Sequence, residues 1–157
     1  MKEDINIREE YNELTKKHKL PKFDDINEDF ELEFIKEKSF LLRQIRRRIN
    51  EKVIFFCRII EGLLYPTQQH IINVTEMKNL PEEKKKYIEK MYRDLMYLER
   101  ESLLLDVVPN DKKDAEYINN VFNFWSKMRK QVEDIVRIMQ ESWKKEDITK
   151  EKNNYFG

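Results

Sequence analysis

The stretch from Phe40 to Leu64 reads FLLRQIRRRINEKVIFFCRIIEGLL, and it decides the fold. Its apolar residues first recur every three or four positions, as on one face of a helix, and then become almost continuous from Val53 to Leu64. A helix that is apolar nearly all round must be surrounded by other elements. We therefore predict a central helix, capped by Ser39 and ending at Tyr65-Pro66, that the rest of the chain encloses.

The remaining sequence supplies amphipathic helices for this purpose. We expect a short first helix over residues 3–19, a helix from Pro81 to about Asp106, and a last helix over residues 111–146 with Asn110 or Asp111 as its cap. The last helix would be about 54 Å long and the central one about 40 Å, so the last helix should overhang its neighbours. Its overhanging end, near Trp143, needs cover, which we expect from the first helix.

Two connections carry further signals. Residues 23–35 alternate aromatic or aliphatic residues with acids, and this acidic block precedes the basic start of the central helix. We predict an extended strap docked on that helix, and the alternative is a solvated acidic linker. Residues 67–80 form a connection long enough to contain a short helix or a functional loop, and the sequence does not decide between them.

These elements predict an all-α fold in a single domain. We expect an antiparallel bundle of three long helices, with a shorter N-terminal helix and the acidic extended connector, over residues 1–146. The charge-rich pattern, with only 2 glycines and 4 prolines in 157 residues, favours long helices over sheets. Residues 147–157 lose the helical pattern and are expected to form a flexible tail.

The composition narrows the environment and the partners. The 31 lysines and arginines balance the 31 aspartates and glutamates, so the net charge does not predict a strongly basic surface. Cys57 is the only cysteine, which excludes an internal disulfide. The first residues lack the apolar core of a signal peptide, and Val53 to Leu64 is too short to cross a bilayer. We expect a cytoplasmic or otherwise intracellular protein without a membrane partner.

The chain offers no recognisable catalytic or cofactor motif. Phosphate-binding loops need more glycines than Gly62 and Gly157, and a di-iron bundle needs Glu-x-x-His units that neither His18 nor His70 completes. Cys57 lies among apolar residues, which argues against a reactive thiol. We therefore expect no metal and no cofactor, and whether the chain is an enzyme stays uncertain, with a non-catalytic role favoured.

Several residues are candidates for binding. Arg43, Arg46 and Arg47 share a polar face of the central helix, and Trp143 lies at the overhanging end of the last one. Tyr155 and Phe156 place two aromatic rings at the end of the tail. We treat these six residues as partner-binding candidates.

Two charged residues interrupt the densest apolar stretch. Arg58 and Glu61 are three positions apart, so they share one side of the helix and can pair. They could form a buried polar pair or the floor of a pocket. In the alternative, Arg58 extends its charged head to the surface of the bundle.

One resemblance is worth stating. An arginine-rich helix that ends in Leu64-Tyr65-Pro66, followed by Met91-Tyr92-Arg93-Asp94-Leu95 on the next helix, resembles the helical domain of GINS replication subunits. It covers two helices, and we carry no function across.

The sequence leaves three functions open. The leading prediction is a non-catalytic helical interaction protein, an adaptor or accessory subunit of a larger intracellular assembly, with a protein partner and homo-oligomer formation as an option. The first alternative is a nucleic-acid-associated accessory protein that uses the arginine-rich face. The second is an enzyme with an unrecognised site between the helices.

Overall fold

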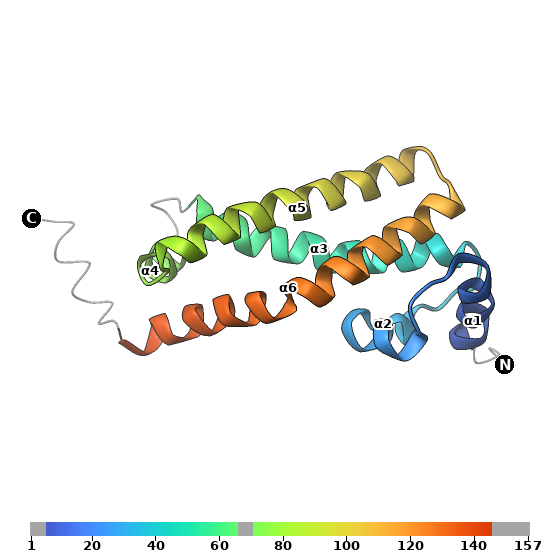
Figure 1. The fold of residues 1–157 in the computed structure, drawn as a ribbon, viewed down its shortest axis with the longest axis horizontal. Coiled ribbons are helices and arrows are strands. Elements are labelled where there is room, and N and C mark those ends of the chain that lie inside the picture. The colour runs from blue at the N-terminus through green and yellow to red at the C-terminus, as the bar shows by residue number, and fades with distance from the viewer. Residues whose placement is uncertain (1–5, 66–70, 146–157) are drawn as a thin grey trace, which may run out of the picture.

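The computed structural model describes residues 6–65 and 71–145, and every regular element in these ranges is a helix (Figure 1). The predicted all-α class is therefore confirmed. In chain order the elements are α1 (Ile7–His18), α2 (Phe23–Phe30), the short 3-10 helix η1 (Leu32–Phe34), α3 (Leu41–Leu64), α4 (Ile71–Lys78), α5 (Glu82–Val107) and α6 (Asp111–Lys145).

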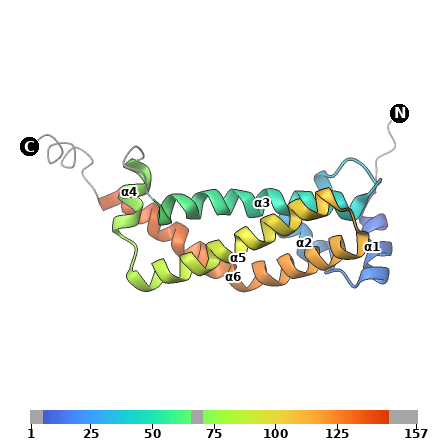
Figure 2. The ribbon, with the colours of Figure 1, turned by 90° about the horizontal axis from the view of Figure 1, so that it is seen from above.

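The three long helices α3, α5 and α6 lie side by side and form the body of the molecule (Figures 1 and 2). The chain runs along α3, returns along α5 and turns again into α6. The short helices α1 and α2 lie near the beginning of α3, and α4 lies near its end. No helix in the described part of the chain combines the length and the apolar character that a membrane span requires.

The core forms along one face of α3. Val53, Cys57, Ile60 and Leu63 are buried in the segment that we expected to be enclosed. However, Phe55 is 58% exposed, so the prediction that this segment is covered all round is wrong. Its long neighbours α5 and α6 pack against one side of α3.

The acidic connector docks on the bundle, as predicted, but it is helical and not an extended strap. Phe23, Ile26 and Phe30 are buried, and their spacing of three and four residues places them on one face of α2. Glu31 ends this helix with a left-handed backbone (φ 54°) and pairs with Arg48 of α3 at 3.1 Å. The alternative of a solvated linker is therefore wrong.

Two predicted helix caps have different outcomes. The side chain of Asn110 accepts a hydrogen bond from the Lys113 amide at 3.0 Å, which confirms it as a cap of α6. Ser39 does not cap α3, because Phe40, with a left-handed backbone (φ 53°), is the residue that precedes the helix. The side chain of Gln44 donates instead to the carbonyl of Ser39 at 2.5 Å.

The connection that the sequence left open contains a short helix, α4. Its place explains Gly62 of α3, because a Cβ atom there would lie 2.9 Å from the Asn73 side chain of α4. This helix also covers the end of α6, where the Trp143 indole donates to the Glu76 carboxylate at 2.9 Å. The prediction that the first helix covers this end is wrong, since α1 lies at the opposite end of the molecule (Figure 1).

We expect Trp143→Phe to lower the free energy of unfolding by about 1–3 kcal/mol. Phenylalanine keeps most of the ring contacts but leaves the Glu76 carboxylate, which is 7% exposed, without this donor. Urea unfolding followed by circular dichroism measures the change. Glu76→Gln keeps an acceptor for the indole, so it should cost less than Trp143→Phe. Equal stability of Trp143→Phe and the wild type would show that α4 is not held by this hydrogen bond.

Candidate functional site

The arginine-rich turn of α3 does not form one surface. The side chain of Arg46 is fully buried, whereas Arg47 is 58% exposed. Arg46 takes a place in the buried stripe itself, because Leu42, Arg46, Ile49 and Val53 follow one another at intervals of four, three and four. The expectation that Arg46 faces a partner is therefore wrong for the described structure, and for Arg43 and Arg47 it stays a prediction.

Arg46 connects all three long helices through hydrogen bonds. Its Nε atom donates to Asp114 of α6 at 2.5 Å. Its Nη1 atom donates to the Ser102 carbonyl of α5 at 2.8 Å and to the hydroxyl of the same residue at 2.7 Å. Its Nη2 atom donates to Asp106 at the end of α5 at 2.6 Å, and Arg47 reaches the same carboxylate oxygen at 3.0 Å.

The charges of this network balance, with two arginines facing two aspartates. Burial raises the pKa of Asp114, against the hydrogen bond from Arg46. Partial burial acts the same way on Asp106, but the hydrogen bonds from Arg46 and Arg47 outweigh it and hold the pKa of that carboxyl below its ordinary value. Arg46 satisfies its donors within this network, whereas the second carboxylate oxygen of Asp114 is buried without a hydrogen-bond partner. The network therefore connects the three long helices.

The second predicted site, the pair Arg58 and Glu61, is not buried. Both side chains are exposed, which makes the buried-pair hypothesis wrong. Glu61 instead accepts a hydrogen bond from the Tyr92 hydroxyl of α5 at 3.2 Å. These residues do not line a pocket floor between the helices.

The remaining nucleophilic group that the sequence singles out, the Cys57 thiol, lies apart from this network. Burial raises the pKa of the Cys57 thiol to about 11, so the thiol stays protonated at neutral pH. Within residues 6–65 and 71–145, no cluster of histidine, cysteine, aspartate or glutamate side chains has the arrangement of a metal site. His70, Tyr155 and Phe156 lie outside the described residues, as does the predicted tail.

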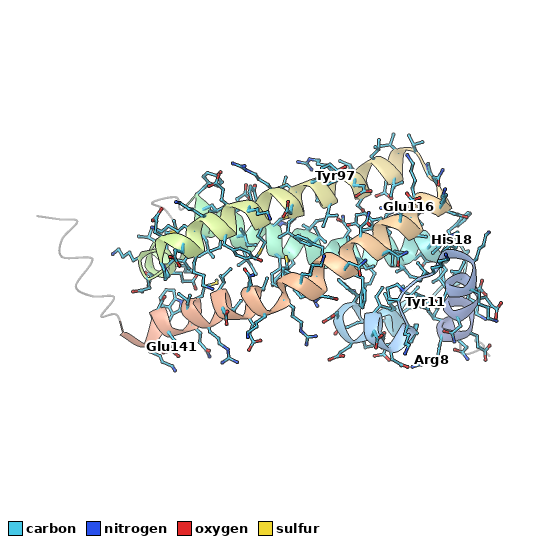
Figure 3. All side chains as sticks on the ribbon, in the orientation of Figure 1. Arg8, Tyr11, His18, Tyr97, Glu116 and Glu141 are labelled. Atoms are coloured by element: carbon cyan, nitrogen blue, oxygen red, sulfur yellow. The ribbon has the colours of Figure 1, made fainter. Side chains whose placement is uncertain are left out.

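A group of large apolar side chains is exposed on the second half of α5 and at the residue that follows it. We call it the α5 outer face: Tyr97 (72% exposed), Leu103 (51%), Leu104 (60%), Val107 (73%) and Val108 (60%). In Figure 3 the labelled Tyr97 lies on the side of α5 remote from α6. Large apolar side chains that gather on a surface mark interaction sites more often than isolated ones do.

The sequence contains a signal for this face that we missed. In the run Leu103-Leu104-Leu105, the helical stripe of α5 takes only Leu105 into the core, where it is 4% exposed. Its two neighbours are rotated by about 100° and 200° from it, so they cannot share its environment. Adjacent leucines beside a core position therefore indicate a second apolar face.

Comparisons of the chain with models of known protein families, with curated proteins and with solved structures give no match.

Proposed function

We propose that this chain is a non-catalytic interaction protein, an antiparallel bundle of three long helices that presents the α5 outer face to a helix of a partner protein. It would act as an adaptor or accessory subunit of a larger intracellular assembly. The observation that carries the proposal is the exposure of five large apolar side chains, four on one face of α5 between Tyr97 and Val107 and the fifth at Val108, directly after the helix.

The shape of the face fits an amphipathic helix. The side chains from Tyr97 to Val107 lie within about a third of the circumference of α5, which is the width of the apolar stripe that helices use to pack together. The face covers about three helical turns. Arg100 lies on the same side of α5 and is 62% exposed, but its guanidinium already pairs with Glu99. A partner helix with apolar residues at helical spacing is the occupant that the exposed apolar side chains favour.

Little in the structure favours the nucleic-acid alternative. Arg46 is buried, Arg47 pairs with Asp106, and Arg48 pairs with Glu31 and Glu51. The guanidinium of Arg43 lies 4.9 Å from the centre of the Phe40 ring, in a cation–π contact. Arginines engaged in this way have less free charge for phosphates than the sequence suggests.

The test is a selection of helical peptides from a library against the purified protein, followed by affinity measurement of the selected peptides. We expect peptides with apolar residues at helical spacing, and we expect Leu104→Glu to weaken their binding at least tenfold. The substitution places a charge in the centre of the α5 outer face, while its effect on stability should stay within about 0.5 kcal/mol because the side chain is exposed.

The matched control is Val136→Glu, which introduces the same charge at an exposed apolar position of α6 (45% exposed) outside the α5 outer face. It should leave peptide binding unchanged. If both variants bind the peptides like the wild type, the α5 outer face is not the docking site. If sedimentation shows a wild-type dimer that Leu104→Glu dissociates, the occupant is a second copy of this chain and not a partner helix.

A further inference from the structure

A groove lies between the end of α2 and the middle of α3, away from the α5 outer face. Its volume is about 420 Å³, within the range of binding pockets. Charged and aromatic side chains line it: Glu28, Asp29, Phe30 and Glu31 from one side, and Arg48, Glu51, Lys52 and Phe55 from the other.

The two cations of the groove already have partners. Arg48 pairs with Glu31 at 3.1 Å and with Glu51 at 2.9 Å, so two glutamates share one guanidinium. The ammonium of Lys52 donates to the backbone carbonyl of Asp29 and lies 4.7 Å from the centre of the Trp125 ring. Arg48 and Lys52 are therefore occupied by groups of the protein itself.

The carboxylates of the groove are less fully matched. Four acids face two cations in the lining, and Arg129 of α6 adds contacts to Asp29 at 3.3 Å and to Glu28 at 3.9 Å. The side chains of Glu28, Glu31 and Glu51 remain 72%, 63% and 65% exposed. The negative end of the α2 dipole lies on the same side. The four acids therefore outnumber the three nearby cations by one, which leaves the groove with a net negative charge.

Phe55 gives the groove an aromatic wall. It is 58% exposed and lies one helical turn after Glu51, so ring and carboxylate are neighbours on α3. A guanidinium can stack on such a ring while its N–H groups bind a carboxylate, a geometry that the compact lysine ammonium matches less well.

The same combination already holds an arginine elsewhere in this protein. Arg8 of α1 donates two hydrogen bonds to Asp24, at 3.0 and 2.6 Å, and its guanidinium lies 4.6 Å from the centre of the Phe23 ring. In the groove, Phe55 and Glu51 provide the ring and the carboxylate; Arg48 pairs with one oxygen of Glu51, and no arginine of the described chain stacks on the Phe55 ring.

We infer that this groove binds an arginine side chain of a partner peptide, stacked on Phe55 and paired with Glu51 and Glu28. The inference uses a different surface from the α5 outer face and does not depend on the proposed function. The groove would be a second, polar recognition site, and it would favour partner proteins that carry an arginine at the matching position.

The experiment titrates a short, end-blocked peptide with one central arginine among glycines and serines into the full chain, followed by NMR chemical shifts and calorimetry. We expect shifts at the amides that line the groove. We expect at least a tenfold loss of affinity with Phe55→Ala and again with Glu51→Gln, both at exposed positions where the fold should tolerate the change. Replacing the arginine by its neutral isostere citrulline should abolish binding.

Matched controls separate this site from general charge attraction. Phe34→Ala removes an exposed ring outside the groove (63% exposed), and Glu33→Gln removes a nearby exposed acid. Both should bind like the wild type, and so should Leu104→Glu of the α5 outer face. Unchanged affinity of Phe55→Ala, a lysine peptide that binds as well as the arginine peptide, or no binding at millimolar peptide would each overturn the inference.

Discussion

Arg46→Ala is expected to lower the free energy of unfolding by about 3–5 kcal/mol, the cost of breaking a buried ion pair by removing one partner. Arg46 is fully buried and donates to Asp114, Ser102 and Asp106. Without Arg46, the Asp114 carboxylate stays buried but loses the ion pair with the guanidinium. Urea unfolding at pH 7 measures the loss.

The pH dependence of this loss has a defined sign. Burial raises the pKa of Asp114, and removing Arg46 takes away the interaction that opposes the rise. A carboxyl whose pKa is higher in the folded than in the unfolded protein destabilises the fold as the pH rises above its unfolded pKa. The destabilisation caused by Arg46→Ala should therefore be smaller at pH 5 than at pH 7.

Arg47→Ala is the matched control for Arg46→Ala. The neighbouring residue pairs with the same Asp106 oxygen, but it is 58% exposed, so its loss should cost less than about 1 kcal/mol. If the two substitutions destabilise the protein equally, Arg46 is not a buried connection between the three long helices.

Phe30→Ala is expected to lower the free energy of unfolding by about 3–5 kcal/mol, as for other large aromatic residues in a core. Phe30 is 4% exposed, and its ring centre lies 6.3 Å from that of Trp125 on α6. The ammonium of Lys52 lies 5.2 Å from the same ring. The residue thus connects α2 to both α3 and α6. Thermal and urea unfolding give the change in stability.

Phe34→Ala provides the comparison within the same acidic segment. This ring is 63% exposed, so its removal should change the stability by no more than about 0.5 kcal/mol. A small effect of both substitutions would mean that the acidic segment does not dock on the bundle. Amide hydrogen exchange adds an independent measurement, since protection across α2 should fall in Phe30→Ala and persist in Phe34→Ala.

The residue types alone could not predict which side chains of the candidate sites are buried and which come together. Arg43, Arg46 and Arg47 read as one polar stripe, yet the fold takes Arg46 inside because Asp114 and Ser102, distant in sequence, supply its hydrogen bonds. The spacing of Leu42, Arg46 and Ile49 contained the clue, but a charged residue in a core stripe makes sense only when its partners are known. The groove at Phe55 likewise forms only where α2 meets α3.

The sequence by itself determined the all-helical class and most helix limits, since apolar periodicity, prolines and the Asn110 cap act within a few residues of the chain. Only the tertiary structure decided which helix covers the end of α6, that α2 is a docked helix, and which side of Val53 to Leu64 is buried. The physical reason is the distance along the chain over which each kind of interaction acts. Local spacing fixes which residues share a face of a helix, whereas the partner of that face depends on contacts between segments far apart in the chain.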